Sequence, residues 1–235
     1  MLTLEKVDSF YGRSHILHGL DLDVPGGKIT AIVGRNGTGK TTLLKTIMGL
    51  TDRTGGRIVL DGRNLAAEPT HRRARAGIAY VPQGRQIIPD FTIRENILMG
   101  GFATTGRGHP RSGGIPPLVP KLFPYLMQNL DRPGGVLSGG QQQQLAIARA
   151  LAAEPSVLLL DEPTEGIQPN IVEEIQNIVV RLNSEEGLTI ILVEQNVAFA
   201  RSAGHHFALL EKGRAVAAGP IATLTDDLIH RHIAV

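Results

Sequence analysis

One stretch constrains the fold of this chain more than any other: residues 34–42 read GRNGTGKTT and fit the phosphate-cradling pattern G-x-x-x-x-G-K-S/T at every required position. The apolar run 29–33 before it predicts a buried strand, and residues 42–48 after it place apolar side chains at helical spacing. A strand, a glycine-rich loop and a helix in this order direct successive N–H groups and a helix N-terminus at an anion. The sequence therefore predicts a phosphate-binding loop.

The residue types in this loop indicate what it binds. Lys40 supplies a positive charge for β- and γ-phosphates, and the hydroxyl of Thr41 is placed to ligate Mg²⁺. A glycine-rich turn that merely links strand to helix is the alternative. A dinucleotide-binding fingerprint is excluded, because the glycines run G-x-x-G-x-G, the reverse of the required spacing.

Composition limits the class of protein. A chain of 235 residues with 42% apolar content can form one α/β domain with a modest subdomain. It has no cysteine, which excludes disulfides and thiolate metal sites. The apolar runs are too short to cross a bilayer and the first residues do not resemble a signal peptide, so we expect a soluble chain. The net charge of +2 does not indicate nucleic acid, and we interpret the basic cluster 72–75 as a solvated helix face.

Several segments predict the framework around the loop. Leu2 to Val7 and Arg57 to Leu60 read as strands, and we expect residues 1–33 and 57–62 to form antiparallel β structure. Tyr11 follows the first of these strands. Its ring is suited to stack on a nucleotide base, although an ordinary aromatic residue at a strand end is an equal alternative.

Three buried strands end in polar side chains, and two of these ends carry side chains that can act on a nucleotide. The strand 78–81 is followed by Gln83, which can contact both a metal and a water molecule. The run 157–160 ends in Asp161 and Glu162; one carboxylate can hold Mg²⁺ while its neighbour orients or deprotonates a water molecule. The strand 188–193 ends at Glu194-Gln195.

A second glycine-containing segment begins a helix. Ser138 and Gln141 form a capping-box pattern ahead of an apolar-periodic run. Gly139 and Gly140 weaken the helix at its first positions. They are explained if a ligand or another backbone approaches the helix N-terminus closely, and a phosphate is the ligand that this positive end prefers.

The remaining segments predict further elements. Thr92 to Glu95 is another capping box, and residues 100–120, rich in glycine and proline, predict a flexible surface loop. Residues 118–130 show helical spacing that Pro120 and Pro124 interrupt. We also expect a helix from Pro169 to about residue 186, a hairpin over 207–216 and a short tail.

The ordered set of motifs resembles the ATP-binding cassette family, the nucleotide-hydrolysing subunits of transporters, across essentially the whole chain. The resemblance implies an α/β P-loop fold with a mixed core sheet, an antiparallel β part and a small helical subdomain. It implies one cassette over residues 1–235, with the core and the antiparallel part in 1–86 and 137–235 and the helical subdomain in 87–136.

The resemblance also assigns roles. Glu162 is implied as the catalytic base, assisted by Gln195 and Gln83, and Tyr11 is implied to stack on adenine. The residues implied to contact ATP in the loop are Gly34, Asn36, Gly37, Gly39, Lys40, Thr41 and Thr42. The residues implied to serve Mg²⁺ are Thr41, Gln83 and Asp161. Those implied to bind the γ-phosphate held by an opposing cassette are Ser138, Gly139, Gly140 and Gln141.

Two positions depart from the common family pattern. Gln195 stands where histidine is usual, and Gln168 stands where aspartate is common. Glutamine can donate to a phosphate oxygen but carries no charge. Both departures resemble importers of branched-chain amino acids, amides and urea, and the segments 141–144 and 164–169 are most similar to the urea-importer subunit. A branched-chain amino acid importer is the alternative, and a DNA-repair or translation ATPase is disfavoured.

This resemblance implies partners and a location. We expect a second cassette, identical or different, paired head to tail with this one. We expect membrane-embedded permease subunits, a solute-binding protein that acts indirectly, and no nucleic acid. The protein would lie peripherally on the cytoplasmic face of the inner membrane.

Overall fold

The strand that leads into the phosphate loop, β3 (Ile29–Val33), lies inside a six-stranded sheet of order β10-β9-β3-β8-β7-β6. The computed structural model describes residues 1–102 and 114–233. Neighbouring strands from β9 to β6 run parallel, and β10 closes one edge antiparallel to β9. The other strands of this sheet are β6 (Ile78–Val81), β7 (Val157–Asp161), β8 (Thr189–Val193), β9 (His206–Glu211) and β10 (Arg214–Pro220).

Burial explains why these segments form a parallel sheet. Every residue of β3, β7 and β8 is buried, as expected for parallel strands covered on both faces. Parallel strands present their carboxyl ends at one edge. The loops that begin at Gly34, Glu162 and Glu194 therefore start side by side, which is where the sequence predicted the site.

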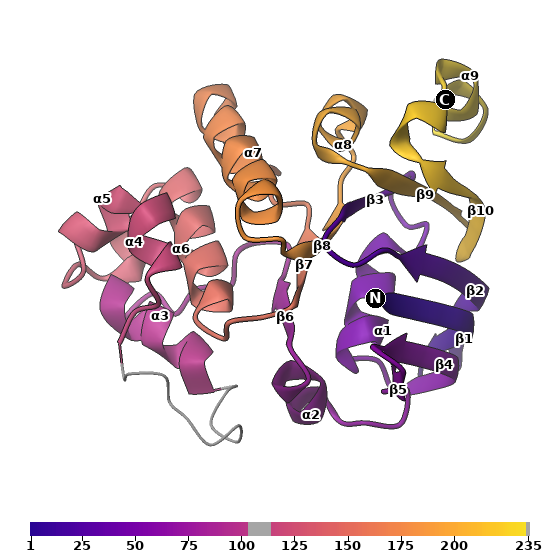
Figure 1. Ribbon diagram of the computed structural model, residues 1–235, viewed down its shortest axis with the longest axis horizontal. Coiled ribbons are helices and arrows are strands. Elements are labelled where there is room, and N and C mark those ends of the chain that lie inside the picture. Colours follow the sequence, from indigo (N-terminus) through magenta and orange to yellow (C-terminus); the bar gives the residue numbers. More distant parts are fainter. Residues whose placement is uncertain (103–113, 234–235) are drawn as a thin grey trace.

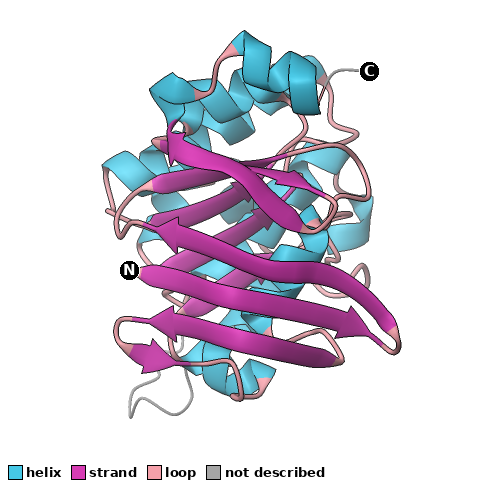
Figure 2. Cartoon of the chain, turned by 90° about the vertical axis from the view of Figure 1, so that its right-hand side faces the viewer, coloured by secondary structure: helices cyan, strands magenta, loops and turns pink. Residues whose placement is uncertain are grey.

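A second sheet lies beside the first and is antiparallel, with the order β2-β1-β4-β5 (Figure 2). Its strands are β1 (Leu2–Tyr11), β2 (Ser14–Val24), β4 (Arg53–Leu60) and β5 (Arg63–Asn64). The antiparallel assignment over 1–33 was wrong for 29–33: β3 joins the parallel sheet, because a strand buried at all five positions cannot present one face to solvent.

The helices fall into separate groups in Figure 1. Helices α3, α4, α5 and α6 gather at the end of the molecule opposite the antiparallel sheet, and α1 lies beside that sheet. Ile97, Val119, Leu126 and Leu145 join the helices of this group into the core that covers one face of the parallel sheet. The helices are α1 (Lys40–Met48), α2 (Thr70–Arg75), α3 (Ile93–Gly101), α4 (Leu118–Leu122), α5 (Pro124–Gln128), α6 (Gly139–Leu151), α7 (Pro169–Ser184), α8 (Val197–Ala203) and α9 (Asp226–His232).

The local signals for helix ends are confirmed. Thr92 and Ser138 form complete capping boxes at the starts of α3 and α6, and Pro169 is the first residue of α7. The interruption within 118–130 is also present, since α4 ends before Phe123 and α5 begins at Pro124. Most of the expected loop 100–120 lies outside the described residues, and α3 continues through Gly101.

One interpretation of a polar segment was wrong, and another segment contains a helix that the sequence did not predict. The basic cluster 72–75 is not a uniformly solvated face, because Arg73 is 2% exposed and donates to the carbonyls of Thr46 and Ile47 near the end of α1. A cation at a helix C-terminus satisfies carbonyls that have no partner within the helix. The expected tail contains α9, whose start is capped by Thr225.

Candidate functional site

The phosphate loop turns sharply between β3 and α1. Gly37 and Gly39 have φ angles of 77° and 103°, a region that only glycine adopts without strain, and Gly39 caps α1. The Nζ of Lys40 folds back over the loop and donates to the carbonyls of Gly34 (2.9 Å) and Arg35 (3.0 Å). Burial lowers the pKa of Lys40, and the nearby Glu162 carboxylate opposes that shift. The loop therefore holds a buried ammonium at the start of a helix.

Asp161 lies at the end of β7 with both carboxylate oxygens engaged. The Thr41 hydroxyl donates to Oδ1 (3.1 Å) and the Tyr80 hydroxyl donates to Oδ2 (3.0 Å). Asp161 is 1% exposed, and this burial raises its pKa against the effect of the two hydrogen bonds. The predicted metal residues Thr41 and Asp161 are thus brought together.

Glu162 is the centre of the cluster. Its backbone has a φ angle of 47°, an uncommon conformation for a residue with a side chain. Its Oε1 lies 3.7 Å from Nζ of Lys40 and accepts a hydrogen bond from Nε2 of Gln195 (3.0 Å), while Oε2 accepts from Nε2 of Gln83 (3.3 Å). Loops after three separate strands and the start of α1 therefore converge on this carboxylate.

The two glutamines connect the carboxylate to the surrounding loops. Gln195 donates to Oδ1 of Asn36 in the phosphate loop (2.6 Å), and Gln83 donates to Glu165 (2.8 Å). Gln83 contacts Glu162 rather than Asp161, so its expected metal role stays a prediction. Gln195 thus lies between the phosphate loop and Glu162, and its expected contact with a terminal phosphate stays a prediction.

Tyr11 ends β1 beside the phosphate-loop helix. Burial raises the pKa of its hydroxyl, which is hydrogen-bonded to the side chain of Thr42. The structure thereby brings Tyr11 and Thr42 together. Its expected stacking on a base stays a prediction.

The segment 138–141 begins α6 and is held by hydrogen bonds within itself. The Ser138 hydroxyl accepts from the N–H of Gln141, and the Gln141 side chain accepts from the N–H of Ser138 (3.0 Å). A methyl group on Gly140 would lie 2.2 Å from Cγ2 of Ile171 on α7, so this glycine is required by close packing within the chain. Among the described residues, no hydrogen bond or ion pair joins 138–141 to the phosphate loop.

Some residues of the site escaped the sequence reasoning. Tyr80 is one, although a hydroxyl inside the short apolar strand 78–81 was a usable signal. Glu165, which accepts from Gln83, is another. Glu194 was noted at the end of its strand but given no role; it is 3% exposed and accepts from the Thr164 hydroxyl (2.8 Å). Burial raises the pKa of Glu194.

The donor set fits Mg²⁺. A hydroxyl and a carboxylate, Thr41 and Asp161, lie 3.1 Å apart at the mouth of the loop, and both offer the oxygen ligands that this ion prefers. No cluster of three histidine, cysteine or acidic residues suited to a metal occurs in residues 1–102 and 114–233. Mg²⁺ is usually held by one or two protein groups together with phosphate oxygens, so a full protein cage is not needed.

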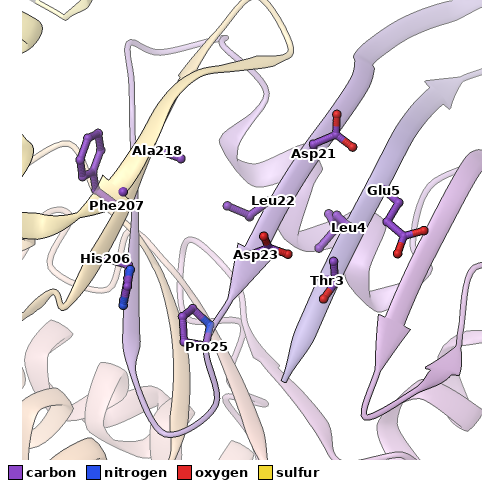
Figure 3. Close-up of a pocket in the computed structure, with 11 residues that line it drawn as sticks. Thr3, Leu4, Glu5, Asp21, Leu22, Asp23, Pro25, His206, Phe207 and Ala218 are labelled. Atoms are coloured by element: carbon purple, nitrogen blue, oxygen red, sulfur yellow. The ribbon is translucent and has the colours of Figure 1, made fainter.

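A groove of about 530 Å³ between the two sheets is separate from this cluster (Figure 3). Asp21 and Asp23 on β2 and His206 on β9 line it. None of the residues assigned to the site does so.

Comparison with known proteins agrees with this geometry. A family model described as "ABC transporter" matches residues 17–165. The chain belongs to the ABC transporter family. It is an ATPase of the cassette type, and the expected fold class is confirmed. Among solved structures, it resembles the cassette MJ0796 in a dimeric post-hydrolysis state with ADP and Pi, at 27% identity and a TM-score of 0.82, over 94% of this chain and 99% of that one.

Two curated relatives are similar over nearly their whole length. The cassette is 39% identical to the high-affinity branched-chain amino acid transport ATP-binding protein BraG of Pseudomonas aeruginosa, covering 92% of this chain and 91% of that protein. It is 38% identical to the probable branched-chain amino acid transport ATP-binding protein LivF of Archaeoglobus fulgidus, over 91% and 89%. These names give the urea expectation no support.

No helix in the described part of the cassette is both long and apolar enough to span a bilayer.

Proposed function

We propose that this cassette is the ATP-hydrolysing subunit of an importer for branched-chain amino acids. The observation that carries the ATPase role is the convergence of Lys40, Gln83 and Gln195 on Glu162 beside the phosphate loop. The cargo rests on the similarity to BraG and LivF, which cover this chain almost end to end.

Binding begins with an exchange of partners. The ammonium of Lys40 now contacts loop carbonyls and Glu162, and a β- or γ-phosphate would take over these contacts together with the N–H groups at the start of α1. Thr42 and Asn36 would contact phosphate, and Tyr11 would lie against adenine. Removal of Lys40 from Glu162 frees a carboxylate oxygen to accept a proton.

Hydrolysis follows from that free carboxylate. Glu162 would take a proton from a water molecule as the water oxygen bonds to the γ-phosphorus, and the bond from that phosphorus to the oxygen it shares with the β-phosphate would break, releasing ADP and phosphate. Gln83 and Gln195 would orient the water and the terminal phosphate. Thr41 and Asp161 would hold Mg²⁺, with Gln83 as a further contact. The ion, when bound, neutralises charge on the phosphate oxygens. The chain supplies the base, the orienting amides and the phosphate cradle.

The second half of each site would come from another cassette. Ser138, Gly139, Gly140 and Gln141 form a helix start that is unconnected to the chain's own loop, so we assign them to the γ-phosphate of ATP held by a partner. Dimeric structures of MJ0796, which is 27% identical to this chain, support the pairing of two cassettes, and we propose that the pairing is head to tail. The partner cassette is a second copy or a different chain.

A permease contact is supported by an apolar groove of about 350 Å³. Its walls come from both the core and the helices, and include Met48, Ala74, Ile88, Met99 and Ala150. We propose that residues 87–136 act as the helical subdomain of the expected cassette 1–235, and that a permease segment with apolar side chains docks in this groove. The cassette would then sit peripherally on the cytoplasmic face of the inner membrane, with a solute-binding protein acting through the permease.

Uptake by deletion strains tests the cargo. Cells that lack this protein should lose high-affinity leucine, isoleucine and valine uptake, and a plasmid copy should restore it whereas a Glu162→Gln copy should not. Radiolabelled leucine and urea, supplied at low concentration under nitrogen limitation, separate the two importer classes. Loss of urea uptake with normal leucine uptake would move the assignment to the urea importer that the segments 141–144 and 164–169 resemble.

A further inference from the structure

Tyr80 faces two regions of the cassette at once. Its hydroxyl donates to Oδ2 of Asp161 at 3.0 Å, and the same residue lines the apolar groove of about 350 Å³. It lies on β6, paired in parallel with β7, and its register partner Leu159 stands two residues before Asp161. A long aromatic side chain is needed to carry a hydroxyl from this strand to the end of its neighbour.

The carboxylate that Tyr80 contacts has little other means of holding its orientation. Asp161 is 1% exposed, so water does not readily replace a lost donor. The Thr41 hydroxyl binds Oδ1, the oxygen on the phosphate-loop side, and Tyr80 alone of the described side chains donates to Oδ2. A carboxylate fixed at only one oxygen can rotate, whereas one fixed at both presents Oδ1 to Thr41 in a single direction.

We propose that Tyr80 is a positioning residue for the metal carboxylate: its hydroxyl holds Oδ2 of Asp161 so that Oδ1 faces Thr41 and the Mg²⁺ that accompanies ATP. The inference rests on the proposed role of Asp161 in holding that ion. Outer partners of metal ligands typically affect metal affinity by 10-fold or more. Tyr80 would therefore act on the ion through its hydrogen bond to Asp161.

The test is Tyr80→Phe in the isolated cassette, because this change removes the hydroxyl and keeps the ring that lines the groove. Mn²⁺ affinity in the presence of ATP, followed by electron paramagnetic resonance, should fall about 10-fold. ATP affinity in EDTA and the melting temperature should match the parent. Tyr125→Phe is the matched control, since its hydroxyl accepts from Arg132 on the surface and should leave Mn²⁺ affinity unchanged.

Each outcome decides the proposal. Unchanged Mn²⁺ affinity in a folded Tyr80→Phe protein overturns it. A loss of ATP affinity in EDTA as large as the loss of Mn²⁺ affinity also overturns it, because the substitution would then act on the phosphate loop rather than on the ion. Thr41→Ala separates this result from the proposed function. If Thr41→Ala also leaves Mn²⁺ affinity unchanged, the metal site itself is misassigned.

Discussion

The two predicted halves of the nucleotide site are built in opposite ways. At the carboxyl edge of the parallel sheet, Glu162 contacts Lys40, Gln83 and Gln195, which come from separate loops and from α1. At the start of α6, Ser138 and Gln141 contact each other. The first half is assembled by long-range contacts, whereas the second is satisfied locally.

This difference indicates which groups of the site still lack a hydrogen-bond partner within the chain. The first four N–H groups of a helix have no partner within it, and the capping box satisfies only those of Ser138 and Gln141. Within the described residues, the N–H groups of Gly139 and Gly140 have no hydrogen-bond acceptor; Gly139 is partly exposed and Gly140 is buried. We therefore propose that the carboxylate half acts on the nucleotide bound by its own chain and that the α6 half acts on a nucleotide held by a partner.

The largest effect is expected at the centre of the first half. Glu162→Gln should slow hydrolysis about 10²–10⁴-fold, because an amide cannot accept the proton of water, while ATP affinity should be retained. Single-turnover hydrolysis and equilibrium binding measure the two quantities separately. An equal loss of both would show that Glu162 is not a base.

Lys40→Ala should act on binding instead. Loss of two charge-assisted hydrogen bonds to phosphate, at about 1.5 kcal/mol each, predicts a fall in ATP affinity of roughly 100-fold. Titration calorimetry measures it, with the exposed Lys28→Ala as the control. Normal affinity in Lys40→Ala would remove the lysine from the phosphate site.

Replacing each of the two glycines of α6 by alanine should affect the stability of the protein differently. Gly140→Ala forces a methyl group to within 2.2 Å of Ile171 and should lower the free energy of unfolding by about 1–3 kcal/mol. Ile171→Ala should restore part of that loss in the double variant. Gly139→Ala meets only the flexible end of Arg85, at 3.0 Å, and should leave stability unchanged. Urea denaturation compares the variants, and equal stability of the two glycine variants would contradict the packing role of Gly140.

The smallest expected effect concerns Gln195. Because a neutral amide does not titrate, the rate of ATP hydrolysis by the parent protein should change little between about pH 6 and 7. In Gln195→His the rate should become pH-dependent near the ordinary histidine pKa of about 6.5. Rate profiles of both proteins in the assembled transporter measure this. If Gln195→Ala hydrolyses ATP as fast as the parent, the contacts with Asn36 and Glu162 have no role in turnover.

The sequence predicted the parts of the fold and site that depend on local pattern. The phosphate loop, the capping boxes and the carboxylates at strand ends are short motifs whose structure follows from their own residues. Tyr80 and Arg73 were missed or misread because their partners are distant in sequence: Asp161 for one and the carbonyls of α1 for the other. The pairing of β3 likewise depended on which segments cover its two faces.

The central claim is that the α6 half of the site acts only on a partner's nucleotide. Ser138→Asp tests it most directly, because aspartate caps a helix as well as serine does and adds a charge that repels a γ-phosphate; Ser138→Asn is the uncharged control. The isolated Ser138→Asp chain should bind ATP as tightly as the parent, while the assembled transporter that contains it loses hydrolysis and the Ser138→Asn transporter keeps it. A fall in ATP affinity of the isolated chain comparable to that of Lys40→Ala would contradict the account.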